Sequence, residues 1–93
     1  MIQSFASKTT EKFWLRENFS ALDPRLTKTA LKRLQILDAA TNIQDLSCLP
    51  GNRLEKLAGS RKGQYSIRIN KQWRICFSWS EDGPHDVEII DYH

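Results

Sequence analysis

The chain has 93 residues, of which 40% are hydrophobic and 27% charged, and it carries a formal net charge of +3 at pH 7. This length and composition predict a single domain over residues 1–93 and are not typical of a disordered chain. No apolar run approaches the roughly 18 residues of a membrane span, and the start lacks the apolar stretch of a signal peptide, so we expect a cytoplasmic protein without membrane contact.

The first half of the chain predicts two helices after a short segment, residues 2–5, that could open a sheet. Ser7 is suited to cap a helix that runs to Leu15. Asp23 followed by Pro24 indicates the start of a second helix, because proline is tolerated at the first helical position. Apolar residues recur along it at spacings of three and four, up to residue 39 or 40: Leu26, Ala30, Leu34 and Leu37. We expect the two helices to form an αα-hairpin.

Strands are predicted in the second half, after Pro50 and Gly51 interrupt the chain. Short runs with apolar residues, most of them alternating with polar ones, indicate the strands: residues 53–57 weakly, then residues 64–70, 73–79 and 87–90. The expected fold is α+β, with two N-terminal helices packed on one face of a small, mainly antiparallel β-sheet whose other face stays open.

Basic residues are concentrated in the part of the chain that precedes and forms these strands. Seven bases lie there against a single acid, Glu55: Arg53, Lys56, Arg61, Lys62, Arg68, Lys71 and Arg74. A local cationic stripe on a mildly basic protein suits a polyanionic partner such as nucleic acid. The alternative is a basic face that is simply solvated.

Arg68 and Arg74 lie opposite the apolar stripes of their own predicted strands, so a hairpin would bring both guanidinium groups to the open face. Arginine offers a fixed fork of donors suited to phosphate. One arginine could hold the phosphate backbone while the other stabilises a pentavalent transition state. The alternative is that both are ordinary solvent-facing strand residues.

The last three residues, Asp91, Tyr92 and His93, directly follow the closing strand. An imidazole that titrates near neutral pH, beside a carboxylate, a phenol and nearby cations, could cleave an RNA phosphodiester. We therefore expect this triplet to lie close to Arg68 and Arg74. The alternative is a frayed chain end without a role.

Glu55 and two further basic residues are also candidate site residues. Glu55 could act as a general base or as a local ion-pair partner of the neighbouring cations. Lys56 and Arg61 are expected to position phosphates. Cys48 and Cys76 are expected to be reduced thiols. No Cys and His cluster has the spacing of a metal site, so we expect no metal and no other cofactor.

Four segments of the chain resemble the HigB-type toxins of bacterial type II toxin–antitoxin modules, within the RelE/ParE superfamily and closest to its GraT-like branch: residues 50–55, 61–70, 72–77 and 87–93. The resemblance implies a microbial-ribonuclease-like fold and a ribosome-dependent endoribonuclease. Such toxins enter the ribosomal A site and cut messenger RNA by attack of a 2′-hydroxyl, without metal. It also implies a HigA-type helix-turn-helix antitoxin, and binding to operator DNA only through that antitoxin.

Asp91, Tyr92 and His93 match the C-terminal triplet of that family, and Arg68 and Arg74 match its strand arginines. Because we expect these residues to converge on one sheet face, we hypothesise that His93 is the general acid for the leaving 5′-oxygen. Asp91 would orient the histidine or assist proton transfer, and Tyr92 would position the scissile phosphate or stack on a base. Better-studied members carry a histidine in place of Glu55. Either this glutamate replaces the histidine as base, or His93 works mostly alone.

Two other functions remain open at this point. A ParE-like gyrase inhibitor would use the same fold for protein binding and would need no terminal acid–base group. An inactive nucleic-acid-binding module would use only the cationic stripe. In the nuclease interpretation, Arg53 and Lys71 of this stripe are expected to bind RNA together with Arg68, Arg61 and Lys56.

Overall fold

The computed structural model describes residues 1–16, 24–48 and 50–91. Its helices are α1 (Lys8–Trp14), α2 (Pro24–Ala39) and α3 (Gln44–Ser47), with two short 3-10 turns, η1 (Pro50–Asn52) and η2 (Gly59–Arg61). Its strands are β1 (Glu55–Lys56), β2 (Gln64–Arg68), β3 (Trp73–Ser80) and β4 (Gly83–Asp91).

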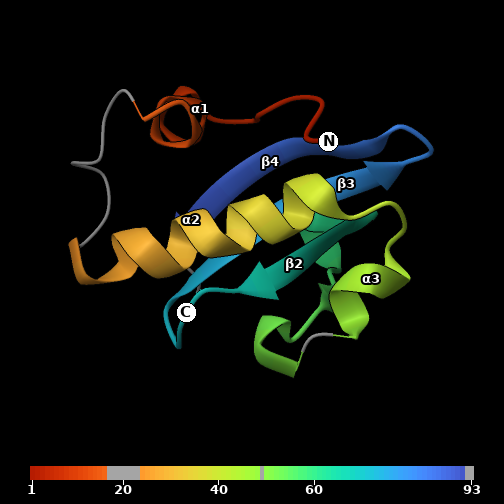
Figure 1. Ribbon diagram of the computed structural model, residues 1–93. Helices are drawn as coiled ribbons and strands as arrows, with labels where there is room; N and C mark the ends of the chain where they lie inside the picture. The colour runs from red at the N-terminus through yellow and green to blue at the C-terminus, as the bar shows by residue number, and fades with distance from the viewer. Residues whose placement is uncertain (17–23, 49, 92–93) are drawn as a thin grey trace.

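The strands form one antiparallel sheet in the order β1-β2-β3-β4, so each strand pairs with its neighbour in the chain (Figure 1). All the strands predicted in the second half are present, but β1 is only two residues long and β4 begins at Gly83 instead of residue 87. A bulge interrupts β4, because Asp86 has a φ of 53° and the register with β3 shifts at this point. The first part of β4 was not predicted, because the residues around Gly83 are of the types that are common in turns.

The outer edge of β4 is covered by the start of the chain. Phe5 makes a parallel bridge with Val87, whose amide donates to the carbonyl of Ser4 at 3.1 Å. Further along the same edge, the amide of Ile89 donates to Thr10 Oγ1 at 3.1 Å. These contacts protect the edge from pairing with another chain. The predicted segment at residues 2–5 therefore does join the sheet, through one bridge.

Helix α1 begins as predicted, because Ser7 Oγ accepts a hydrogen bond from the amide of Thr10 at 3.3 Å. Figure 1 shows α1 end-on, whereas α2 runs across the view. The predicted αα-hairpin is therefore wrong. Helix α1 is attached to β4 through Thr10 and buries Phe13 in the core, so its direction is set by the sheet rather than by α2.

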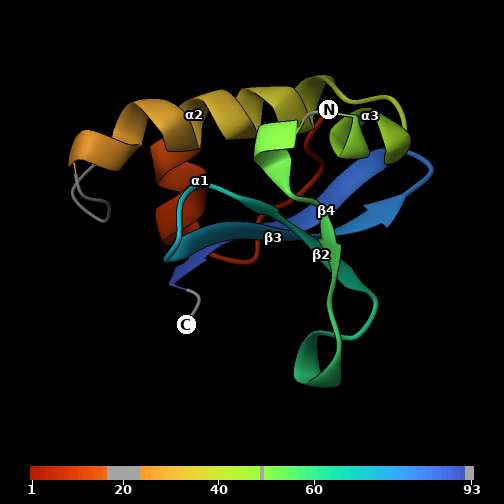
Figure 2. The same ribbon diagram turned by 90° about the horizontal axis from the view of Figure 1, so that it is seen from below.

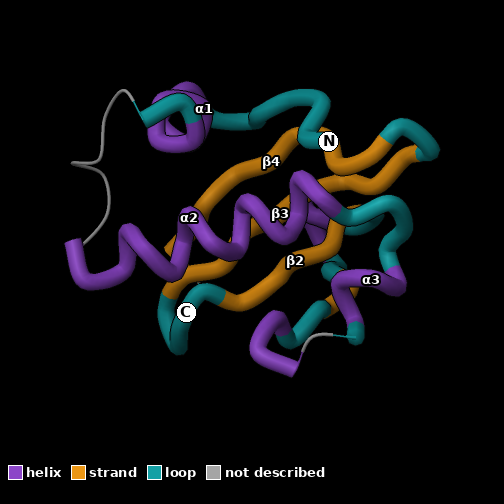
Figure 3. Tube along the Cα trace, viewed as in Figure 1, coloured by secondary structure: helices purple, strands orange, loops and turns teal. Residues whose placement is uncertain are grey.

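Helix α2 lies across one face of the sheet (Figures 1 and 3). It begins at Pro24 and ends at Ala39, as predicted, while the proposed cap Asp23 lies outside the described residues. The apolar stripe of α2 packs on the apolar face of β2 and β3, and the fully buried residues of this contact are Ala30, Leu34, Leu37, Ile67, Ile75 and Phe77. Burial of this apolar area holds the two layers together.

The opposite face of the sheet is open. Figure 2 shows α2 and α3 on one side, while the turn η2, drawn in green, projects on the other. Within the described residues, no helix crosses that other face. Helix α3 was not predicted; its four residues bury Leu46 and lead into η1.

Candidate functional site

The pairing register decides which side chains share the open face. Arg68 pairs directly with Arg74, and Ser66 with Cys76, whereas Ile67 pairs with Ile75 on the helix side. Successive side chains of a strand alternate between faces, so both arginines lie on the open face. Like charges directly opposite each other are destabilising, and a bound anion would relieve that cost.

A hollow of about 270 Å³ surrounds the two arginines, and we call it the arginine cavity. It is lined by Arg53, Glu55, Arg68, Asn70, Lys71 and Arg74. Five of these six residues were predicted site residues, and the sixth, Asn70, was placed at the end of the predicted strand 64–70 without a role in the site. The structure therefore brings together the strand arginines, the candidate base and two of the predicted backbone contacts.

Arg74 is buried, with only 6% of its surface exposed. Its Nε donates to Ser66 Oγ at 2.7 Å, and its Nη2 donates to the carbonyl of Arg53 at 2.7 Å. A buried charge is tolerated only when it is hydrogen-bonded, and these bonds fix the plane of the guanidinium group. The interpretation of Arg74 as an ordinary solvent-facing residue is wrong.

Glu55 lies at the rim of the arginine cavity. It pairs with Ser66 across β1 and β2, and its Oε1 is 3.9 Å from Arg74 Nη1. This ion pair is long, and it is solvated because half of the Glu55 side chain is exposed. Both of the roles considered for Glu55, ion-pair partner and general base, are compatible with this position.

The carbonyl that accepts the hydrogen bond from Arg74 belongs to Arg53, which has an unusual backbone conformation. Arg53 has a φ of 45°, in the left-handed region that residues other than glycine rarely adopt. The preceding residue, Asn52, is fully buried; its Nδ2 donates to the carbonyl of Leu46 at 3.1 Å, and its Oδ1 accepts from Arg33 Nη1 at 3.1 Å. Asn52 thus fixes η1 against α2 and α3, and with it the carbonyl of Arg53.

Sequence reasoning missed both supports of Arg74. Ser66 lies two residues before Arg68 on the same face of β2, and that spacing was the available signal. Asn52 gave no such signal, because its partners come from α2 and from α3.

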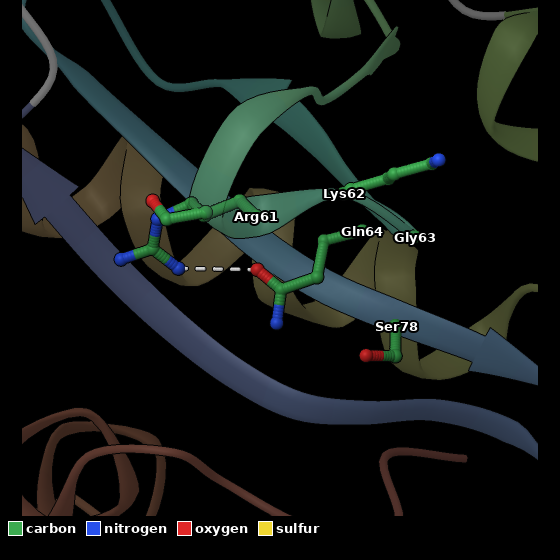
Figure 4. Close-up of a pocket in the computed structure, with 6 residues that line it drawn as sticks. Arg61, Lys62, Gly63, Gln64 and Ser78 are labelled. Carbon is green, nitrogen blue, oxygen red and sulfur yellow. Dashed lines mark hydrogen bonds between the residues drawn. The ribbon is translucent and has the colours of Figure 1, made fainter.

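Arg61 lies in a second hollow of about 430 Å³, which we call the second cavity. It is lined by Ser60, Arg61, Lys62, Gly63, Gln64 and Ser78. Figure 4 shows Arg61 beside Gln64, whose Oε1 accepts from Arg61 Nη1 at 3.1 Å. Arg61 Nη2 donates to Glu88 Oε1 at 3.1 Å, across the sheet surface. The structure therefore places Arg61 on the open face but not in the arginine cavity.

Two predicted site residues lie on the other face by register. Lys56 pairs with Tyr65, and Asp91 pairs with Trp73, both on the helix side. Asp91 Oδ2 accepts from Gln72 Nε2 at 3.0 Å. Lys56 is therefore separated from the strand arginines, and its expected role in positioning phosphates stays a prediction. The register also separates Asp91 from their face, because β4 extends one residue further than predicted.

Tyr92 and His93 lie outside the described residues. Their placement beside Arg68 and Arg74 stays a prediction.

Cys76 lies beneath the open face, fully buried, while Cys48 is exposed, and both are free thiols. Desolvation raises the pKa of the Cys76 thiol, and the carboxylate of Glu88 adds to this, while the charges of Arg61 and Arg74 oppose it. The thiol of Cys76 is therefore neutral at physiological pH.

Within residues 1–16, 24–48 and 50–91, no group of three His, Cys, Asp or Glu side chains is placed to hold a metal ion. None of the helices in this part of the chain is long and apolar enough to cross a membrane.

Residues 3–93 match the model of a family described as the RelE-like toxin of the type II toxin–antitoxin system HigB. The chain belongs to this HigB-like toxin family. It is 44% identical over 94 residues to Toxin HigB-1 of Vibrio cholerae serotype O1, covering 100% of this chain and 98% of that relative. It is 30% identical over 93 residues to Endoribonuclease HigB of Proteus vulgaris, covering 100% of each chain.

The fold is similar to that of a chain in the YoeB-YefM complex from Staphylococcus aureus. The TM-score is 0.62 at 18% sequence identity, and the match covers 100% of this chain and 98% of that chain. The expected α+β fold and the resemblance to HigB-type toxins are confirmed.

Proposed function

We propose that this HigB-like toxin is a ribosome-dependent endoribonuclease that cuts messenger RNA during translation. The observation that carries the proposal is the arginine cavity, where the buried Arg74 is held rigidly beside Arg68 and Glu55 on an uncovered face. The name of the Proteus vulgaris relative, Endoribonuclease HigB, supports the same reaction class.

The proposed reaction is transesterification within the RNA strand. A base removes the proton of a ribose 2′-hydroxyl, and its oxygen attacks the adjacent phosphorus. The bond to the 5′-oxygen then breaks, and an acid protonates that oxygen as it leaves. Negative charge accumulates on the phosphoryl oxygens between these steps, where fixed donors are most effective.

Arg74 is the proposed transition-state donor, because its hydrogen bonds hold it without reorganisation. Arg68 binds the phosphate backbone from the adjacent strand. Glu55, at the rim of the cavity, is the proposed base, and the roles of His93 as acid and of Tyr92 as a phosphate or base contact remain part of the proposal. Asp91 would act on His93 from the edge of β4 rather than on the phosphate.

RNA contacts beyond the cleaved bond are assigned to Arg53 and Lys71 in the arginine cavity and to Arg61 in the second cavity. Such contacts position the strand and weaken with salt. Lys56 would reach RNA only around the short edge strand β1.

The proposed partners are the ribosomal A site, messenger RNA and a HigA-type helix-turn-helix antitoxin, through which operator DNA is bound. The family description names a toxin–antitoxin system, and the structural neighbour was itself found in a complex named for two proteins, YoeB and YefM.

The test uses a reconstituted translation system with a defined message. Wild-type protein and His93→Ala are added with and without ribosomes, and the 5′ ends of the products are mapped by primer extension. We expect codon-phased ends only with wild-type protein and translating ribosomes. Equal cutting of free RNA would contradict ribosome dependence, and unchanged cutting by His93→Ala would remove His93 from the mechanism. Inhibition of gyrase supercoiling without any RNA cleavage would contradict the nuclease altogether.

A further inference from the structure

We propose that the second cavity is a subsite for a nucleotide flanking the cleaved bond, and that it prefers a base presenting carbonyl oxygens. This inference rests on the proposed function, because it assigns the cavity to the same RNA strand.

The two cavities lie along one track on the open face. Gln64 and Ser78 form one cross-strand pair at the second cavity, and Arg68 and Arg74 form the pair four residues further along β2. At about 3.3 Å per residue, the two pairs are roughly 13 Å apart. That distance corresponds to about four stacked nucleotides at roughly 3.4 Å each, and to fewer in an unstacked strand.

The chemistry of the lining favours a nucleotide over a peptide. All six lining residues are polar or glycine, so the cavity offers no apolar anchor of the kind that peptide docking requires. Gly63 has a φ of 93° and no atom within 4 Å of where a Cβ would be, so the wall of the cavity is open at this turn.

The ion pair with Glu88 offsets part of the charge of Arg61, so Arg61 positions the strand without making the cavity a dedicated phosphate clamp. Lys62, which extends outward in Figure 4, adds a positive charge at the rim. The neutral polar groups of the lining are the side-chain amide of Gln64 and the hydroxyl of Ser78, which can hydrogen-bond to the polar edge of a base.

The bond from Arg61 fixes the orientation of the Gln64 amide. Arginine can only donate hydrogen bonds, so the atom of Gln64 facing Arg61 must be the carbonyl oxygen. Gln64 therefore presents its NH2 group to the cavity, beside the hydroxyl of Ser78 (Figure 4). The Gln64 NH2 group only donates, and the hydroxyl of Ser78 can donate beside it, so the pair suits the carbonyl oxygens of guanine or uracil.

The first test measures, by fluorescence anisotropy, the binding of RNA oligonucleotides of increasing length. A 2′-O-methyl group at every ribose prevents their cleavage. We expect affinity to rise with length until the strand spans both cavities, and then to level off. Gln64→Ala should lose roughly three- to tenfold in affinity for the long strands only, as expected for one or two lost hydrogen bonds. Lys28→Gln, on the outer surface of α2, is the control and should match wild type.

The second test separates base recognition from a structural effect. Gln64→Glu replaces the donor with an acceptor, so it should shift preference towards adenine or cytosine at the flanking position. The shift is read by sequencing message ends after cleavage on ribosomes, and independently by anisotropy with blocked strands that differ only at that position.

Three results would overturn the subsite. Gln64→Ala could weaken dinucleotides and long strands equally, Gln64→Glu could leave the base preference unchanged, or both variants could impair only antitoxin binding measured by calorimetry. The last result would assign the cavity to a protein partner. If the wild-type protein binds blocked RNA with the expected length and base dependence but cuts no message, the proposed function fails, while the second cavity remains a base-selective RNA-binding site. If it cuts messages without such dependence, only the subsite fails.

Discussion

The hydroxyl of Ser66 is one of the close acceptors that hold Arg74 in place. Ser66 is fully buried, and its Oγ is the acceptor for Arg74 Nε at 2.7 Å. Without this acceptor, Arg74 keeps its charge and its bond to the carbonyl of Arg53, but the plane of the guanidinium group is held less firmly. We therefore regard Ser66 as a positioning residue, which acts on the phosphate only through Arg74.

We predict that Ser66→Ala lowers the free energy of unfolding by about 1–3 kcal/mol, because it removes the buried acceptor of Arg74 Nε. In the reconstituted translation assay, the maximal cleavage rate should fall at saturating ribosome concentration, with little change in the half-saturating concentration. Ser66→Thr keeps the hydroxyl and should restore part of the rate. Ser80→Ala, at the exposed end of β3, is the matched control. A stability loss without any loss of rate would show that Ser66 is only structural.

The two cysteines should differ in reactivity. Cys76 is buried and its thiol pKa is raised, while Cys48 is exposed. Thiolates are the reactive form, so under native conditions iodoacetamide should modify Cys48 first, and Cys76 only through unfolding. Mass spectrometry of peptides after timed labelling would measure both rates. Equal rates in the folded protein would contradict the burial of Cys76.

The raised pKa also has a consequence for stability. Between the ordinary thiol pKa and the raised one, the unfolded chain has lost the Cys76 proton while the folded chain keeps it. The folded state therefore binds more protons, and stability falls as pH rises through this window. Below the ordinary thiol pKa both states are protonated, so Cys76 contributes no pH dependence there.

At the scale of elements, the η1 segment links the helix layer to the site. Asn52 is bonded to Arg33 on α2 and to the carbonyl of Leu46 on α3, and the next carbonyl in the chain, that of Arg53, holds Arg74. The position of the buried arginine is thus set from three segments that are distant in sequence.

We predict that Asn52→Ala costs about 1–3 kcal/mol of stability, because it removes the hydrogen bonds that the buried Asn52 makes to the carbonyl of Leu46 and to Arg33. Chemical denaturation would measure this loss. Gln35→Ala, at an exposed position of α2, should stay within about 0.5 kcal/mol of wild type. An equally small effect of Asn52→Ala would contradict the proposed link.

The elements that the sequence predicted well are those determined by local chemistry. Pro24 marked the start of α2, and alternation marked β2 and β3, so the shared face of Arg68 and Arg74 was predictable. The direction of α1 was not predictable, because it depends on the hydrogen bond from the amide of Ile89 to Thr10, and these two residues are far apart in the sequence. The face of Asp91 was not predictable either, because it depends on where β4 ends.

At the scale of the whole molecule, the two faces of the sheet have separate tasks. One face buries the apolar stripes of β2 and β3 under α2, and the other carries the arginine cavity and the second cavity. A packed core beneath a polar surface lets site residues be held rigidly while the site itself stays accessible. That accessibility fits a substrate delivered by a large partner such as the ribosome.

The most direct test of the proposed nuclease site is the mapping of message ends with Arg74→Lys in the translating system. Lysine keeps the positive charge but cannot reproduce the fork that bonds Ser66 and the carbonyl of Arg53. After a thermal melt has shown that the variant is folded, we predict that codon-phased ends fall by about 100-fold, as expected for loss of a transition-state donor. Lys28→Gln should cut like wild type. A folded Arg74→Lys protein that produces the wild-type pattern at the wild-type rate would contradict the assignment of cleavage to the arginine cavity.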